Sequence, residues 1–205
     1  MSGSNSGTGG RVYGVAVRAM VVFTLVLGVG YTLAVTAVGQ LMLPAQARGS
    51  AVTRADGTVV GSALIGQSFT GADGKPLPQY FQSRPSAAGT GYDAAASSGS
   101  NWGPENPDLI KAITARKAQV AAFDGVSPAQ VPPDAVTASA SGLDPDISPA
   151  YAAIQVDRVA AARQLPVDEV RALVAAHTQG RPWGFLGEPT VNVVELNLAL
   201  DRLAG

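Results

Sequence analysis

The feature that most limits how this chain can fold is a run of 25 residues without a charged side chain, from Ala19 to Leu43. At ~1.5 Å per residue, a helix of this length reaches roughly 37 Å, enough to cross a hydrocarbon core of about 30 Å with some tilt. We therefore expect a membrane-spanning helix over residues 19–43, preceded by a short tail of residues 1–18 and followed by a domain of residues 44–205.

A cleaved secretory signal is the alternative interpretation of this run. Ala45, Gln46 and Ala47 form the A-x-A pattern of a signal-peptide cleavage site directly after it. The apolar region of a signal peptide is only about 7 to 15 residues long, which is shorter than the run found here. We therefore favour an uncleaved anchor, and under either interpretation the C-terminal part of the chain is exported.

The charges beside the span leave its orientation nearly balanced. Arg11 and Arg18 flank one end, and Arg48 and Arg54 flank the other. The tail before the span has no acidic residue and opens with a flexible Gly/Ser run. We expect a single-pass protein of the cell membrane, with a cytoplasmic N-terminus and an extracytoplasmic C-terminal domain.

Composition limits what this domain can be. Its 162 residues are a usual size for one domain with a single core. The absence of cysteine excludes disulfides and thiolate metal sites. The net charge of −1 and the absence of a basic run argue against a nucleic-acid partner.

Helix and strand patterns after the span predict a mixed α+β fold. Asn or Ser followed by Pro is typical of a helix start, and runs of β-branched residues are typical of strands. The expected elements are one or two strands within Thr58–Phe69, a helix from Asn106 to Gly125, a strand over Ala135–Ala140, a helix from Ser148 to about Gln164, a helix from Pro166 to before Gly180, a strand over Thr190–Glu195, and a helical turn or two over Leu196–Leu203.

A long segment rich in Gly, Pro, Ser and Asn, residues 70–107, follows the first strands. A disordered linker is one interpretation, but the segment holds bulky aromatic anchors that linkers lack. We expect an ordered irregular loop in which residues 97–107 form a framework or docking element. Trp102, next to Asn101, is expected either in the core or at a contact with another subunit.

The patterns of common catalytic and nucleotide sites are missing from the sequence. His177, the only histidine, lies near the end of an expected helix, and no G-x-S-x-G elbow accompanies it. The only Gly-Lys pair, Gly74 and Lys75, is followed by proline rather than by the Ser or Thr of a phosphate loop. Asp144 and Asp146 begin like a calcium loop, but its further ligands are missing, which favours a turn before a helix. The residues therefore indicate no catalytic group, metal site or securely bound cofactor.

Six longer strings connect the chain to a known family. They are GSALIGQSF (61–69), YFQSRPSAAG (80–89), SSGSNWGPENPDL (97–109), VTASASGLDPDISP (136–149), QVDRVAAAR (155–163) and VNVVELNLAL (191–200). In this order, behind a single N-terminal span, the chain resembles the C subunit of the Kdp potassium-transporting ATPase, the KdpC family. Tyr151 is bulkier than the family pattern, and the N-terminal Gly/Ser tail has no counterpart in it.

The resemblance implies a potassium importer built of several chains. A channel-like subunit moves potassium, a P-type ATPase subunit hydrolyses ATP, and a small single-span subunit accompanies them. This chain would be the non-catalytic accessory subunit that stabilises their assembly, because it lacks the D-K-T-G-T loop of P-type pumps and has too few spans for a pore.

A further family proposal is a catalytic chaperone that raises the ATP affinity of the ATPase subunit, with a nucleotide contact at Gln155. The expected topology opposes a direct contact, because an exterior Gln155 and cytoplasmic ATP lie on opposite sides of the bilayer. Gln155 and Arg158 lie one turn apart on one helix face, where a framework role and a partner contact are both open. The other candidates for structural or partner contacts are Asn101, Trp102, Ser141, Asp144, Asn192 and Asn197.

Two function classes outside this family stay open. One is a membrane-tethered exported hydrolase, which needs a nucleophile and a base that the sequence does not show. The other is an extracytoplasmic binding protein, which needs a domain that is stable without partners.

The apolar run is expected to remain attached as an anchor. N-terminal sequencing and intact mass of the detergent-extracted protein should therefore show a chain that still contains residues 19–43. A mature protein that begins at Arg48 would show that the run is a signal peptide.

Overall fold

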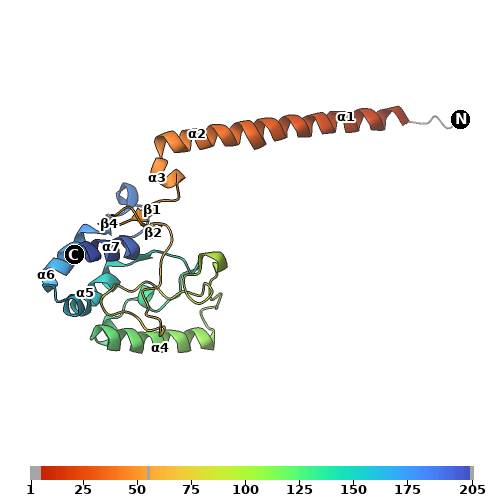
Figure 1. Ribbon diagram of the computed structural model, residues 1–205. Coiled ribbons are helices and arrows are strands. Elements are labelled where there is room, and N and C mark those ends of the chain that lie inside the picture. Colours follow the sequence, from red (N-terminus) through yellow and green to blue (C-terminus); the bar gives the residue numbers. More distant parts are fainter. Residues whose placement is uncertain (1–5, 55, 204–205) are drawn as a thin grey trace. The chain divides into compact units, whose positions relative to one another are not determined.

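The structure, a computed structural model, describes residues 6–54 and 56–203 (Figure 1). Contacts divide the chain into two compact units, Met1–Ser50 and Ala51–Gly205. The first unit is helical, and the second combines helices with short strands. The expected α+β fold class with one apolar N-terminal helix is confirmed.

The first unit consists of a long apolar helix and a short second helix. The long helix contains a π-helical stretch and has no break. It ends at Leu43, which is not helical because the proline that follows disfavours the helical conformation of the residue before it. The elements in chain order are α1 (Ser6–Phe23), the π-helix η1 (Thr24–Tyr31), α2 (Thr32–Met42) and α3 (Pro44–Ala47).

Within the described residues, one helical stretch, Gly10–Met42, is long and apolar enough to cross a membrane. Its 33 residues include the expected span up to Met42 and extend it toward the N-terminus. Residues 6–18 of the expected tail are therefore helical, and residues 1–5 lie outside the described part of the chain.

The second unit contains two small antiparallel sheets. β1 (Ala51–Thr53) pairs with β2 (Val59–Ser62), and β5 (Thr190–Asn192) lies between β3 (Asp146–Ile147) and β4 (Thr178–Gln179). The strands are two to four residues long. Such short ladders satisfy few backbone groups, so other contacts must hold the irregular segments.

Helices supply most of the regular structure of the second unit (Figure 1). α5 contacts α4 and α6, and α6 contacts α7. The α-helices are α4 (Pro107–Asp124), α5 (Pro149–Arg163), α6 (Val167–Ala176) and α7 (Val193–Leu203), and the one-turn 3₁₀ helices are η2 (Ala94–Ala96), η3 (Pro128–Gln130), η4 (Pro133–Ala135) and η5 (Pro182–Gly184).

The starts of α4 and α5 follow from the local sequence. The side chain of Asn106 accepts a hydrogen bond from the backbone N–H of Asp108, and the hydroxyl of Ser148 accepts one from Tyr151. In both helices a proline follows the cap, at a position that needs no N–H donor. α4 ends at Gly125, whose φ of 68° is left-handed. Both predicted starts and this end are confirmed.

The strand expected over Ala135–Ala140 is wrong. Ala135 ends the 3₁₀ helix η4, and the residues that follow are irregular. The N–H of Ser139 donates to the carbonyl of Pro85, so this stretch bonds to another irregular segment instead of joining a sheet.

The strand expected over Thr190–Glu195 is too long. It ends at Asn192, whose side-chain oxygen accepts a hydrogen bond from the backbone N–H of Glu195. This bond caps α7, so the closing helix begins at Val193 rather than at Leu196.

The core of the second unit lies where α5, α6 and α7 meet the three-stranded sheet. Buried side chains repeat at helical spacing along α5, which turns one apolar face inward. The buried apolar residues of this cluster include Phe81, Ile147, Ala152, Val156, Val159, Val170, Val191, Val193, Leu196 and Leu200.

Ser148 joins its cap to a second contact. Its hydroxyl donates to Asp134 Oδ1 at 2.9 Å, and its backbone N–H donates to Oδ2 of the same carboxylate at 2.7 Å. Ser148→Ala should lower the free energy of unfolding by about 1–2 kcal/mol, because it removes the cap and a partner of this carboxylate. Asn106→Ala, which removes an exposed cap alone, should cost less. Equilibrium denaturation of the detergent-solubilised chain measures both losses, and equal losses would contradict the role of Asp134.

Candidate functional site

Residues 78–82, here called the clamped segment, run past α5 and α7 without joining either sheet. Each of the five backbone carbonyls accepts a hydrogen bond from a side chain of one of these two helices. Arg158, Arg163 and Gln155 are the donors on α5, and Asn197 is the donor on α7. The side chains take the place of a neighbouring strand.

Two amide side chains hold consecutive residues of the clamped segment by both backbone groups. Asn197 Oδ1 accepts from the N–H of Phe81, and its Nδ2 donates to the carbonyl of Phe81, both at 2.9 Å. Gln155 repeats this arrangement on Gln82, with distances of 2.7 Å to the N–H and 3.2 Å to the carbonyl. Gln155 is fully buried, and Asn197 is 2% exposed. The pairing fixes Phe81, whose ring is fully buried in the core.

Arg158 binds the start of the clamped segment. One of its terminal nitrogens donates to the carbonyls of Pro78 at 2.5 Å and Tyr80 at 2.9 Å, and the other donates to Gln155 Oε1 at 2.8 Å. Its Nε donates to Asp124 of α4 at 2.7 Å. Arg158 therefore connects α4, α5 and the clamped segment through one planar group.

The ion pair of Arg158 with Asp124 is almost fully buried. The two side chains are 8% and 2% exposed. Burial raises the pKa of Asp124, and the hydrogen bond and charge of Arg158 oppose this shift. Removing one partner of such a pair costs about 3–5 kcal/mol, because the other charge is then left unpaired.

Arg163 supplies the remaining donor. Its Nε bonds to the carbonyl of Gln79 at 2.7 Å, and a terminal nitrogen bonds to Asp201 of α7 at 2.7 Å. The guanidinium also lies 4.7 Å from the ring centre of Tyr80. Its side chain is 9% exposed, so this second arginine is also built into the interior.

Residues 139–146 are here called the serine–aspartate segment. A second set of hydrogen bonds joins this segment to residues 84–98. Ser86 Oγ donates to the carbonyl of Gly142 at 2.7 Å, and Arg84 pairs with Asp144 at 2.8 Å. Gly142 has a φ of 70°, and a Cβ there would lie 2.6 Å from a backbone oxygen, so only glycine fits. The two irregular segments are thus in close backbone contact.

Ser141 and Tyr92 extend this second set of bonds. The carbonyl of Ser141 accepts from the hydroxyl of Ser97 and from the N–H of Ser98. The hydroxyl of Tyr92 donates to the carbonyl of Arg84 at 2.9 Å. Burial raises the pKa of Tyr92 to about 12, so this donor stays protonated to a more alkaline pH than an ordinary tyrosine does.

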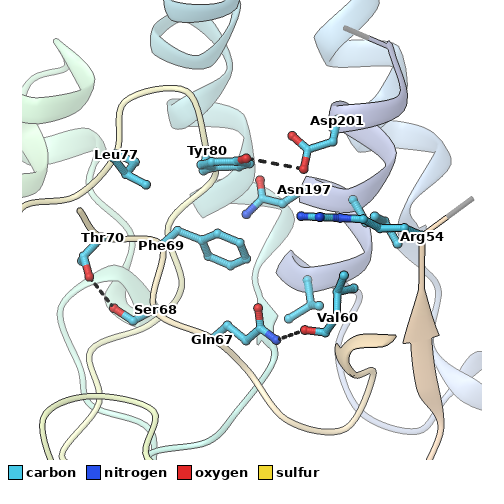
Figure 2. Close-up of a pocket in the computed structure, with 12 residues that line it drawn as sticks. Arg54, Val60, Gln67, Ser68, Phe69, Thr70, Leu77, Tyr80, Asn197 and Asp201 are labelled. Carbon is cyan, nitrogen blue, oxygen red and sulfur yellow. Dashed lines mark hydrogen bonds between the residues drawn. The ribbon is translucent and has the colours of Figure 1, made fainter. Parts of the chain in front are cut away.

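A surface hollow of about 180 Å³ lies beside the clamped segment, with Tyr80, Asn197 and Arg54 among its lining residues (Figure 2). Small-molecule sites usually measure roughly 300–1,000 Å³. The hydroxyl of Tyr80 donates to Asp201 at 3.4 Å, so these two polar groups of the wall are partners of each other. Two wider hollows, of about 510 and 610 Å³, are both lined by the paired Arg84 and Asp144.

Comparison of the sequence with known proteins identifies one family. The family model described as "K+-transporting ATPase, c chain" matches residues 13–202. The chain is 60% identical over 185 residues to the potassium-transporting ATPase KdpC subunit of Kineococcus radiotolerans, covering 90% of each chain. It is 53% identical to that of Beijerinckia indica over 89% of each, and 52% identical to that of Mycobacterium tuberculosis over 92% of this chain and 96% of the relative. The chain belongs to the KdpC family.

The structure brings three of the predicted site residues of this KdpC-family chain together. Gln155 and Arg158 are in direct contact, and Asn197 holds the residue next to the one that Gln155 holds. Asn192 lies apart from them, where its Nδ2 donates to the carbonyl of Ala63 at 2.8 Å. Ser141 and Asp144 lie in the serine–aspartate segment.

Asn101 and Trp102 are exposed in the KdpC-family structure. Asn101 has a left-handed backbone with a φ of 53°. Trp102 is 39% exposed, so of its two expected positions the core is excluded, and a contact with another subunit stays a prediction. His177 is the C-terminal cap of α6, as expected for a residue at a helix end.

Several framework residues of this site were not among the sequence candidates. They are the arginine, acidic and glutamine partners Arg163, Asp124, Asp201, Arg84 and Gln82. Arg84, Gln82 and Arg163 lie inside the matching strings, which is the signal that could have identified them. Asp124 and Asp201 lie outside the strings, and only the folded structure places them opposite their arginines.

Asn197→Leu should destabilise the protein strongly. Leucine has a similar size, but it leaves the N–H and the carbonyl of Phe81 buried without partners, which costs about 1–3 kcal/mol for each group. Gln119→Leu on the exposed face of α4 is the matched control and should stay within about 0.5 kcal/mol of wild type. Denaturant unfolding of the detergent-solubilised chain measures both, and a wild-type midpoint for Asn197→Leu would refute the clamp.

Proposed function

We propose that this KdpC-family chain is the non-catalytic accessory subunit of a Kdp-type potassium-transporting ATPase. It stabilises the assembly of a channel-like potassium subunit, a P-type ATPase subunit and a small single-span subunit in the cell membrane. The apolar helix anchors it in the lipid bilayer with the N-terminus in the cytoplasm and the folded domain outside.

The observation that carries this proposal is how the polar groups of the interior are used. Gln155, Arg158, Arg163 and Asn197 all bond to the backbone of the clamped segment. A catalytic group must instead be free to reach a substrate. In this proposal the polar side chains of the matching strings build the framework of the domain, and ATP and potassium are handled by the other subunits.

A direct ATP contact at Gln155 has little support in this geometry. The side chain is fully buried, its Oε1 accepts hydrogen bonds from Gln82 and Arg158, and its Nε2 donates to Gln82. A nucleotide would have to displace these bonds. We infer that any increase in the ATP affinity of the complex comes from contact between this subunit and the ATPase subunit.

Exposed irregular chain is the part best suited to contact partner subunits. Residues 97–107 are fixed at one end by the bonds to Ser141 and at the other by the start of α4, so they present a preformed surface. Trp102 and Ile110, 39% and 54% exposed, add apolar area to it. A preformed surface loses little entropy on binding, which favours tight assembly.

Gln155→Ala tests the framework role against nucleotide binding. We expect a lower thermal midpoint of the full chain, a lower yield of assembled complex, and a matching fall in ATP-dependent potassium uptake. The reason is that the substitution removes both partners of the Gln82 backbone and one partner of Arg158. Gln119→Ala, in an exposed glutamine, is the control and should leave all three unchanged.

Nucleotide binding by the purified full chain completes this test. We expect no ATP binding by wild type at physiological ATP concentration. Binding by wild type that Gln155→Ala abolishes, with the thermal midpoint unchanged, would assign Gln155 to a nucleotide site.

A further inference from the structure

The loop between β4 and β5 carries an apolar cluster that points into solvent. Residues 181–188, here called the hairpin tip, connect two antiparallel neighbours of the three-stranded sheet. Trp183 is 85% exposed, Phe185 69% and Leu186 43%. An almost fully exposed tryptophan requires an explanation, because burying its large apolar surface would be favourable.

The hairpin tip differs from the other exposed apolar residues of the domain. Within residues 51–54 and 56–203, no other window of four residues holds three large exposed apolar side chains. The others, such as Val59 and Ile110, occur singly or as the pair Leu64 and Ile65. Scattered apolar residues are normal on a protein surface, whereas a cluster marks an interaction site.

Local contacts give the hairpin tip a defined shape. Arg181 and Glu188 form an ion pair at 2.5 Å across the base of the hairpin tip. The six residues between them carry no charged side chain. Two turn bonds, from Gly184 N–H to the Arg181 carbonyl and from Leu186 N–H to the Pro182 carbonyl, satisfy backbone groups within the loop.

The backbone of Trp183 is also unusual. Its φ of 53° is uncommon for a bulky residue, and strained positions of this type concentrate at functional sites. The ring lies 6.5 Å from that of Phe185 in a tilted arrangement. The two rings therefore form one aromatic surface at the end of the hairpin.

The covalent link to the membrane span limits how far the domain can move from a bilayer. The residues from Leu43 to Ser50 join the span to the second unit. Even fully extended, eight residues would reach at most about 28 Å, and α3 makes the link shorter. A folded domain of the size of the second unit has a radius of gyration of about 15 Å, so the diameter of the domain exceeds the length of the link. The link is therefore too short to carry the domain far from the membrane.

We propose that the hairpin tip inserts into the interfacial layer of the bilayer that the chain's own span crosses. Trp183 and Phe185 have the amphipathic and apolar character of residues in membrane-interface belts, and Leu186 adds apolar area. The ion pair of Arg181 with Glu188 lies at the base of the hairpin, at the level of the headgroups. Lipid fits better than a protein groove, because a short protruding loop with a neutral apolar end needs no shaped partner.

The test uses the full chain reconstituted into phosphatidylcholine vesicles, with or without bromine on the lipid acyl chains. The chain has two tryptophans, so Trp102→Phe leaves Trp183 as the reporter, and Trp183→Phe is the matched variant that leaves Trp102. We expect brominated lipid to quench Trp183 fluorescence by about half or more and to leave Trp102 nearly unchanged, because bromine quenches only rings that it contacts and an inserted Trp183 would lie at the membrane–water interface. In the Trp102→Phe background, Phe185→Ser with Leu186→Ser should reduce the quenching and shift emission to the red.

The same measurement on the complex assembled with its partner subunits separates lipid from protein as the occupant. Quenching of Trp183 in both preparations supports the proposal. Absence of quenching in the chain alone would overturn it, and a blue shift of Trp183 only on assembly would assign the hairpin tip to a subunit contact. A wild-type thermal midpoint for Trp102→Phe and Trp183→Phe confirms that each reporter is folded.

Discussion

Backbone groups of the clamped segment, above all those of the buried Phe81 and its neighbour Gln82, need hydrogen-bond partners in a domain whose sheets are too short to supply them. A buried polar group without a partner costs about 1–3 kcal/mol, so several of them would remove most of the stability of a domain. Side chains of α5 and α7 meet this need, with Gln155 and Asn197 each holding one residue by both its backbone groups. The position of Phe81 in the core, and with it the packing of both helices, depends on this clamp.

The same need explains why the four polar side chains that bond to the clamped segment are not free for other chemistry. Arg158 and Arg163 are charged groups that an active site could use, but both are paired with carboxylates and bonded to carbonyls. Such a network is rigid because each member fixes the next. Rigidity of this kind suits the accessory role that we propose.

The sequence predicted the helices better than the strands because a helix start is a local event. Asn106 and Ser148 cap helices through bonds to residues two and three positions further on, so the signal lies within a few residues. Strands need a partner that is distant in the sequence. The apolar stretch over Ala135–Ala140 has strand character, yet the folded chain offers it no strand to join and holds it by a bond from Ser139 to Pro85. The site residues were only partly predicted for the same reason. The strings that contain Gln155 and Asn197 are local and could be recognised, but the backbone of the clamped segment that both side chains bind is distant in the sequence and could not be identified.

The sequence by itself determined the apolar helix, the family, the capped helices and the absence of cysteine, because each is written in a contiguous run or in composition. Only the tertiary structure decided that Gln155 faces the backbone of Gln82, that Asp124 neutralises Arg158, and that Trp102 and Trp183 lie in solvent. The first two facts join residues 73 and 34 positions apart, and the bond of Phe81 with Asn197 joins residues 116 positions apart. Burial and pairing over such distances depend on the packing of the whole domain, which no local pattern in the chain records.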